Sequence, residues 1–250
     1  MPVEKRKQSE SIVILFKGGR LASWYELSQD EQHDYAHLHV ELMLSVARKH
    51  RMMRLEGFRL MTPLESYQRF WVMEFPCLTG AEAWIKAEME PPYGYYGYYE
   101  YYLSRNWRPD YFSNWVTNPP NPVRPMVTDP HNIPVLCENK NSVVVLLFDR
   151  WRPGAEEVDP VKRGDEEHIR LMKSVAAEHD LMRLEGFHLI SPQADWHRAW
   201  VIEFPTLKGA EAWIDAEVSP PHGIYAQKTM HLARKWSPEY FSSWVTMETA

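Results

Sequence analysis

The sequence predicts an α+β fold made of two tandem copies of one βαββαβ unit, and two observations lead to this prediction. Residues 50–117 and 179–246 align without a gap at a constant offset of 129 residues, with 38 of the 68 aligned positions identical. Each copy also shows the same order of strand-like and helix-like segments. Because each repeat is long enough to be a small domain, we expect two similar domains related by an approximate twofold axis.

Each copy begins with a run of β-branched and apolar residues, Ser11–Phe16 and Ser142–Phe148, which is typical of a buried strand. An amphipathic helix is expected next. It runs from about Tyr35 to His50 in the first copy, and the second copy has apolar residues at the same helical spacing around 171–176.

Two strands follow in each copy, through MRLEGF and then through WVMEF or WVIEF, and their closeness along the chain favours antiparallel pairing. A second helix begins near Gly80 or Gly209 and is interrupted by a Pro-Pro pair, because an interior proline removes a backbone hydrogen bond. A further helical stretch to Trp107 or Trp236 and a final strand, YFSNWVT or YFSSWVT, complete each copy. This order is the ferredoxin-like plan.

Six prolines within residues 118–135 indicate a stiff, extended connector between the copies. We therefore expect residues 1–120 to form the first α+β barrel repeat, residues 121–136 a proline-rich linker, and residues 137–250 the second repeat.

Composition limits the class of protein. The net charge of −6 is mild and no cluster of Lys and Arg recurs, which argues against a nucleic-acid partner. No apolar run approaches the length of a membrane span, and the first apolar stretch is too short for a secretory signal, so we expect a cytoplasmic protein without a membrane partner. The two cysteines do not match across the repeat, which favours free thiols.

The run EFPxLxGAEAWIxAExxPPxG occurs in both copies and resembles dimeric α+β barrel proteins, YCII-related ones in particular. The resemblance implies that the two units place their sheets face to face and close a barrel within one chain, an intrachain pseudo-dimer with one ligand cleft per unit. It also implies a site histidine early in the first helix, where His39 and His168 fall. The Asp-Pro turn of the family is replaced here by Glu88 and Glu217, each three residues before a proline.

Charged side chains on the paired strands are expected to point into the barrel. Residues alternate between the two faces of a strand, and Arg54 and Glu56 share the face that is opposite the apolar one. Three explanations stay open: a structural ion network, a site in which an arginine anchors an anionic oxygen and a glutamate acts as the base, or exchanged faces with solvated charges. The residues concerned are Arg54, Glu56, Glu74, Arg183, Glu185 and Glu203.

The copies diverge after the prolines, where the first is rich in tyrosine and only Tyr96 and Tyr225 match early in the stretch. Tyr96, Tyr225 and His222 are candidate substrate-binding residues, and the added His222, Lys228 and His231 favour the second copy as the working site. The paired tryptophans either fill two cores or wall a ligand cavity. No metal is expected, because His33 and His37 have metal-binding spacing but no match in the second copy and no further ligand nearby in sequence.

The sequence thus predicts an enzyme that acts on a small aromatic or polyketide-like anionic molecule by cofactor-free acid-base chemistry of the isomerase, lyase, cyclase or hydrolase type. His39 or His168 would move the proton, with Glu56, Glu74, Glu185 and Glu203 as orienting groups or bases and Arg54 or Arg183 holding the anion. The alternatives are a non-catalytic ligand-binding protein, a cofactor-free oxygenase, or a haem-dependent oxygenase, because some tandem barrels in the chlorite dismutase group bind haem through a histidine. Association into a larger homo-oligomer stays open.

Overall fold

A computed structural model describes residues 11–63, 67–193 and 196–246. The first half contains β1 (Ile12–Arg20), α1 (Ala22–Tyr25), α2 (Gln29–Lys49), β2 (Arg54–Leu60), β3 (Arg69–Phe75), α3 (Leu78–Glu88), η1 (Tyr93–Tyr96), β4 (Gly97–Trp107) and α4 (Pro109–Ser113). The second half contains β5 (Val143–Trp151), η2 (Ala155–Glu157), α5 (Pro160–Arg163), α6 (Asp165–Glu178), β6 (Arg183–Gln193), β7 (Trp196–Phe204), α7 (Leu207–Val218), η3 (His222–Tyr225), β8 (Ala226–Trp236) and α8 (Pro238–Ser242).

The eight strands form one closed antiparallel barrel in the order β1-β3-β2-β8-β5-β7-β6-β4. The two halves are joined where β2 pairs with β8, with Gly57 opposite Trp236, and where β4 pairs with β6, with Trp107 opposite Gly186. The predicted fold class, two βαββαβ units closing a barrel within one chain, is therefore confirmed.

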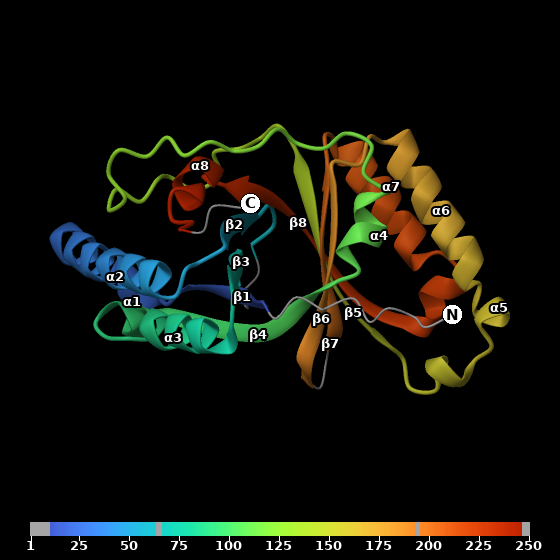
Figure 1. Cartoon of the computed structure of the whole chain (residues 1–250), viewed down its shortest axis with the longest axis horizontal. Coiled ribbons are helices and arrows are strands. Elements are labelled where there is room, and N and C mark those ends of the chain that lie inside the picture. The colour runs from blue at the N-terminus through green and yellow to red at the C-terminus, as the bar shows by residue number, and fades with distance from the viewer. Residues whose placement is uncertain (1–10, 64–66, 194–195, 247–250) are drawn as a thin grey trace.

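Three apolar cores follow from the alternation of side chains along the strands. The barrel interior is filled from both halves by residues such as Val13, Phe58 and Val201. On the outer face of the sheet, the first half packs α2 and α3 against one core and the second half packs α6 and α7 against another. Figure 1 shows the two helix pairs at opposite ends of the molecule with the strands between them.

The last strand of each unit lies elsewhere than the sequence pattern indicated. The stretch expected to be helical up to Trp107 is strand β4, and its counterpart up to Trp236 is β8. The predicted final strands YFSNWVT and YFSSWVT instead contain the short helices α4 and α8, each with a proline in its first turn. Both predictions were wrong because aromatic and β-branched residues decide strand formation only together with their cross-strand neighbours.

The helices α4 and α8 cross over to the opposite half. Helix α8, from the end of the chain, packs on β2 of the first half, and α4 packs on β6 of the second. Figure 1 shows α8 on the side of α2 and α4 on the side of α7. The segment 121–136, which lies between α4 and β5, has no helix or strand. The division into two repeats and a linker stays a prediction.

Two smaller expectations concern the described residues only. Cys77 and Cys137 are free. Within these ranges of the chain, no helix is both long and apolar enough to cross a bilayer.

Candidate functional site

Each half holds a cavity between its helix pair and the outer face of the sheet. The first cavity has a volume of about 220 Å³ and the second about 190 Å³. Aromatic rings form much of the walls, and some come from the opposite half: α8 supplies Tyr240 and Phe241 to the first cavity, and α4 supplies Tyr111 and Phe112 to the second. Paired aromatic residues therefore both fill cores and wall cavities.

A histidine and a glutamate face each other in each cavity. His39 Nε2 on α2 lies 3.4 Å from Glu88 Oε2 on α3, and His168 Nε2 on α6 lies 3.6 Å from Glu217 Oε2 on α7. His39 is buried, and its ring stacks on Tyr93 at 3.8 Å between centroids. Since the paired helices pack side by side, the repeat places the same two side chains together in both halves.

Two of the cations that line the second cavity, Arg198 and Lys228, are neutralised by the chain itself, and the third, Arg108, is exposed. Arg198 Nε donates to Asp149 Oδ1 at 2.6 Å, and Trp200 donates to the other oxygen of that carboxylate at 2.8 Å. Lys228 forms a close ion pair with Glu217. Burial alone would raise the pKa of Glu217, but the hydrogen bond from His168 and the charge of Lys228 outweigh it and lower that pKa to about 2.

His222 replaces Tyr93 in the second half, and its ring stacks on His168 at 3.8 Å between centroids. Burial, followed by the charges of His168 and Lys228, lowers the pKa of His222 to about 4. The second cavity therefore holds a neutral imidazole at position 222 at neutral pH.

The first cavity has two cations, Arg20 and Arg69, and among the described residues neither has a carboxylate in ion-pair contact. The charge of Glu88, which lines the same cavity, acts on both from farther away. Arg69 lies opposite Gly18 on β1, where Arg198 lies opposite Asp149 on β5. Within the described residues, no carboxylate oxygen lies within 4 Å of the Arg20 or Arg69 guanidinium. Burial lowers the pKa of both arginines, and the charge of Arg69 helps to lower that of Arg20, to about 10.

Aromatic rings hold Arg20 in place. Its guanidinium carbon lies 3.6 Å from the centroid of the Tyr93 ring and 4.2 Å from that of Trp24. Arg69 lies 5.0 Å from the Trp236 ring, and its buried Nε has no hydrogen-bond partner among the residues that the structure describes. Both cations are thus positioned by π faces and keep N–H donors for a ligand.

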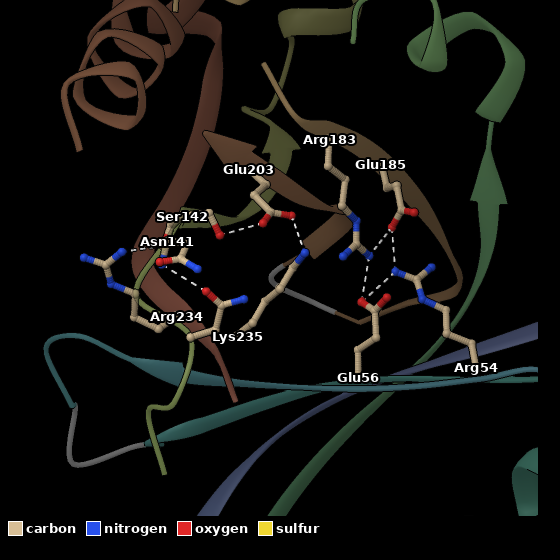
Figure 2. A network of polar contacts seen from close by, with 10 residues as sticks. Arg54, Glu56, Asn141, Ser142, Arg183, Glu185, Glu203, Arg234 and Lys235 are labelled. Atoms are coloured by element: carbon tan, nitrogen blue, oxygen red, sulfur yellow. Dashed lines mark hydrogen bonds and ion pairs between the residues drawn. The ribbon is translucent and has the colours of Figure 1, made fainter. Parts of the chain in front are cut away.

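The predicted strand charges form a separate cluster inside one end of the barrel, which we call the arginine–glutamate ring (Arg54, Glu56, Arg183 and Glu185). Arg54 lies 3.0 Å from Glu56 and 2.7 Å from Glu185, and Arg183 lies 2.8 Å from Glu56 and 2.6 Å from Glu185. Figure 2 shows the four side chains closing on one another. The expected orientation into the barrel is therefore correct.

Two further carboxylates flank the ring. Glu74 accepts hydrogen bonds from Ser11 at 2.6 Å and Asn106 at 3.2 Å. Glu203 accepts from Ser142 at 2.6 Å and pairs with Lys235 at 2.7 Å, as Figure 2 shows. All these partners belong to the chain, which favours the structural ion network among the three explanations.

The structure does not bring the predicted site residues into one place. The ring, Glu74 and Glu203 lie on the inner face of the sheet, whereas His39 and His168 lie on the outer side beneath the helices. His222 lines the second cavity, but Tyr96 and Tyr225 line neither. Arg20, Arg69 and Asp149 were not predicted from the sequence. Arg69 could have been, because it is identical to Arg198 at the equivalent position of the repeat.

Comparisons with known proteins identify the fold of the chain but assign it to no family. No protein-family model and no curated protein sequence matches the chain, so the YCII-related resemblance stays a prediction. A variant of chlorite dismutase from Candidatus Nitrospira defluvii matches with a TM-score of 0.67 at 9% identity, over 96% of this chain and 97% of that chain. A second variant, in complex with cyanide, matches with a TM-score of 0.66 at 9% identity, over 96% of both chains.

A solved structure of another protein described as a chlorite dismutase matches with a TM-score of 0.63 at 11% identity, over 95% of this chain and 99% of that chain. These likenesses show the dimeric α+β barrel fold. They contradict the prediction that no cofactor takes part, because chlorite dismutases are haem-dependent and share the fold over almost the whole chain.

The cavities themselves test whether haem fits. A buried imidazole beside a carboxylate is a suitable pair for a haem iron, since a ligating histidine commonly donates its other N–H to a carboxylate. The space is not suitable. Volumes of about 220 and 190 Å³ are close to the ~150 Å³ cavity that holds one benzene ring, and a porphyrin joins four pyrrole rings. Haem does not fit either of these two cavities as their side chains lie.

Proposed function

We propose that the first cavity binds a small, flat, anionic molecule, such as an aromatic carboxylate or phenolate, and that the protein is an enzyme acting on it with His39 as the proton-handling group. The pair Arg20 and Arg69, which has no ion-pair partner among the described residues, is the observation that carries this proposal.

The charges of Arg20 and Arg69 give the strongest support to this proposal. A buried cation without a counter-ion loses several kcal/mol of hydration free energy, so chains normally place a carboxylate beside it, as Asp149 is placed beside Arg198. In the first half, Gly18 occupies the position equivalent to Asp149, opposite Arg69. A bound anion would supply the missing charge, and a guanidinium fork suits a carboxylate in two-point contact.

The shape and lining of the first cavity indicate the class of ligand. Rings of Trp71, Tyr99, Trp236 and Phe241 line the first cavity, and its volume of about 220 Å³ suits one or two fused rings. Flat ligands gain most from such walls, because aromatic faces pack edge-on or offset against them. The anionic aromatic substrate expected from the sequence belongs to this class.

His39 supports a chemical role in addition to binding. It lines the same cavity as the two arginines, and Glu88 at 3.4 Å orients its ring. An oriented imidazole beside a bound anion is the usual arrangement for taking or giving a proton during a reaction. Glu88 acts as the positioning residue.

The proposal assigns the working site to the first half, although sequence divergence favoured the second. We infer that the two halves descend from one duplicated unit. The second half kept the histidine and glutamate, while Asp149 and Lys228 supplied internal partners that close it to anions.

A binding experiment tests the charge argument. Calorimetric titration should show benzoate or 1-naphthoate binding once per chain, with the neutral amides of the same shape binding at least tenfold more weakly. Removing a hydrogen bond to a charged group costs about 1.5–3 kcal/mol, so Arg20→Met and Arg69→Met should each weaken binding by about tenfold or more. The matched control Arg198→Lys, which keeps the pair with Asp149, should bind normally. Equal binding of acid and amide, or no effect of Arg69→Met, would refute the proposal.

A second experiment tests the reaction. Aromatic carboxylates and phenolates are incubated with the protein, and the mixture is analysed by mass spectrometry. His39→Gln should retain binding within about threefold and lose product formation. A ligand that binds at Arg20 and Arg69 but is always recovered unchanged would make the protein a carrier instead of an enzyme.

A further inference from the structure

Three side chains with metal-binding atoms meet where the linker passes over helix α2. His37 and Glu41 lie one turn apart on α2, and His131 reaches them from the linker, 94 residues after His37 and 90 after Glu41. His37 Nε2 is 3.5 Å and His131 Nε2 is 3.8 Å from the same oxygen, Glu41 Oε1. The ligand atoms of all three residues lie within 4.8 Å of one another.

His131 is prepared as a ligand by a neighbouring carboxylate. Its Nδ1 lies 3.3 Å from Asp129 Oδ1, and the backbone N–H of His131 donates to the same oxygen at 2.9 Å. A proton held on Nδ1 leaves the lone pair on Nε2, which is the arrangement found in metal-binding histidines. Nε2 is buried and has no hydrogen-bond partner in the described part of the chain.

The ligand atoms are spaced as for a tetrahedral ion, and the rings of His37 and His131, which stack at 4.1 Å between centroids, would turn so that both lone pairs face the ion. Zinc–nitrogen and zinc–oxygen bonds of about 2.0–2.2 Å give ligand-to-ligand distances of about 3.3–3.5 Å at the tetrahedral angle. Two of the distances here, 3.5 and 3.8 Å, are already near this value. Two imidazoles and one carboxylate are a ligand set that zinc uses in proteins.

We propose that His37, Glu41 and His131 bind a divalent cation of the zinc type, with the fourth position open to solvent. Glu41 and Asp129 balance the charge of the ion. The sequence predicted no metal, because His33 and His37 have no match in the second copy and no further ligand nearby in sequence. The fold brings His131 from the linker beside His37.

The site has a structural role, because it fastens the linker across the first cavity. Ile133, Pro134 and Leu136, directly after His131, line that cavity. The ion joins their segment to α2, the helix that carries His39. Metal binding is thus expected to order one wall of the cavity without touching a bound anion.

The test uses the full chain, freed of metal by a chelator and titrated with Zn²⁺ in a calorimeter. Wild-type protein and the control His188→Ala, which removes an exposed histidine on β6, should each bind one equivalent. His37→Ala and His131→Ala should bind at least tenfold more weakly, and Asp129→Asn, which loses the orienting carboxylate, about 10–100-fold more weakly.

A second measurement separates this site from adventitious binding. Zn²⁺ should slow proteolysis or hydrogen exchange of residues 128–136 in the wild type and in His188→Ala, and have no such effect in His131→Ala. Absence of stoichiometric binding by the wild type, or undiminished binding by both His37→Ala and His131→Ala, would overturn the proposal. Benzoate binding is independent of these outcomes, because Arg20 and Arg69 do not belong to the metal cluster.

Discussion

Arg183 on β6 donates a hydrogen bond of 2.8 Å to Glu56 on β2, although these strands are not neighbours in the barrel. Arg54 returns the contact by donating to Glu185 at 2.7 Å. The two bonds cross the barrel interior and join the first half to the second (Figure 2). The arginine–glutamate ring therefore links the two halves through side chains, in addition to the two backbone ladders.

The first prediction concerns the stability of this ring. Glu56→Gln removes one of two carboxylates that balance two arginines, and should lower the free energy of unfolding by about 1–3 kcal/mol. This value lies between those for exposed and buried pairs, because the Glu56 side chain is 35% exposed. Urea denaturation measures it. The control Glu82→Gln, an exposed glutamate on α3, should change stability by less than ~0.5 kcal/mol. Equal effects of the two substitutions would show that the ring is energetically idle.

The second prediction uses the charge difference between the cavities and rests on the proposed function. Asp149→Asn leaves Arg198 without its counter-ion, so the second cavity acquires an unneutralised cation like that of the first. We expect a loss of about 1–3 kcal/mol of stability and a second benzoate site per chain. Calorimetric titration measures the number of benzoate molecules bound per chain. If this number stays at one, the pairing of Arg198 with Asp149 is not what keeps anions out of the second cavity.

The third prediction is a pH dependence caused by His222. Its pKa is lowered to about 4 in the folded chain, below the unperturbed value near 6.5, so the unfolded chain binds the proton more readily between these values. Stability should therefore fall as the pH drops from about 6.5 to about 4, by up to about 3 kcal/mol.

A substitution matched to the first half isolates the contribution of His222 to this pH dependence. His222→Tyr introduces the residue found at position 93 in the first half and removes the titrating group. Stability of this variant, measured by urea denaturation at a series of pH values, should be flatter than that of the wild type between pH 6.5 and 4. The loss of stability caused by protonation of Glu217 occurs at lower pH, between about 4.5 and 2, and should remain in the variant. Parallel curves for the two proteins would contradict the assignment to His222.

The parts of the structure that could be predicted are those governed by local periodicity. Alternation along MRLEGF placed Arg54 and Glu56 on the inner face, and the repeat offset made His39 and His168 equivalent. Both inferences need only the geometry of one strand or one helix. The structure agrees with them because each such segment has one clearly apolar face.

The remaining features depend on contacts between distant segments. Strand β4 is defined by pairing with β1 on one side and with β6 of the other half on the other, which no local pattern reveals. The missing counter-ion of Arg69 becomes visible only when Gly18 is found opposite it. His131 likewise reaches His37 only because the linker folds back over α2.

The last prediction concerns the crossing of α8 onto the first half. Tyr240 on α8 is buried and donates a hydrogen bond of 2.5 Å to the carbonyl oxygen of Pro130 in the linker. Its counterpart Tyr111 on α4 is 38% exposed. Tyr240→Phe should therefore cost about 0.5–1.5 kcal/mol and speed proteolysis of the linker, whereas Tyr111→Phe should cost less than ~0.5 kcal/mol. Zn²⁺ should restore part of the protection in Tyr240→Phe, since the cluster at His131 fastens the same segment independently. Identical behaviour of the two variants would mean that α8 does not hold the linker in place.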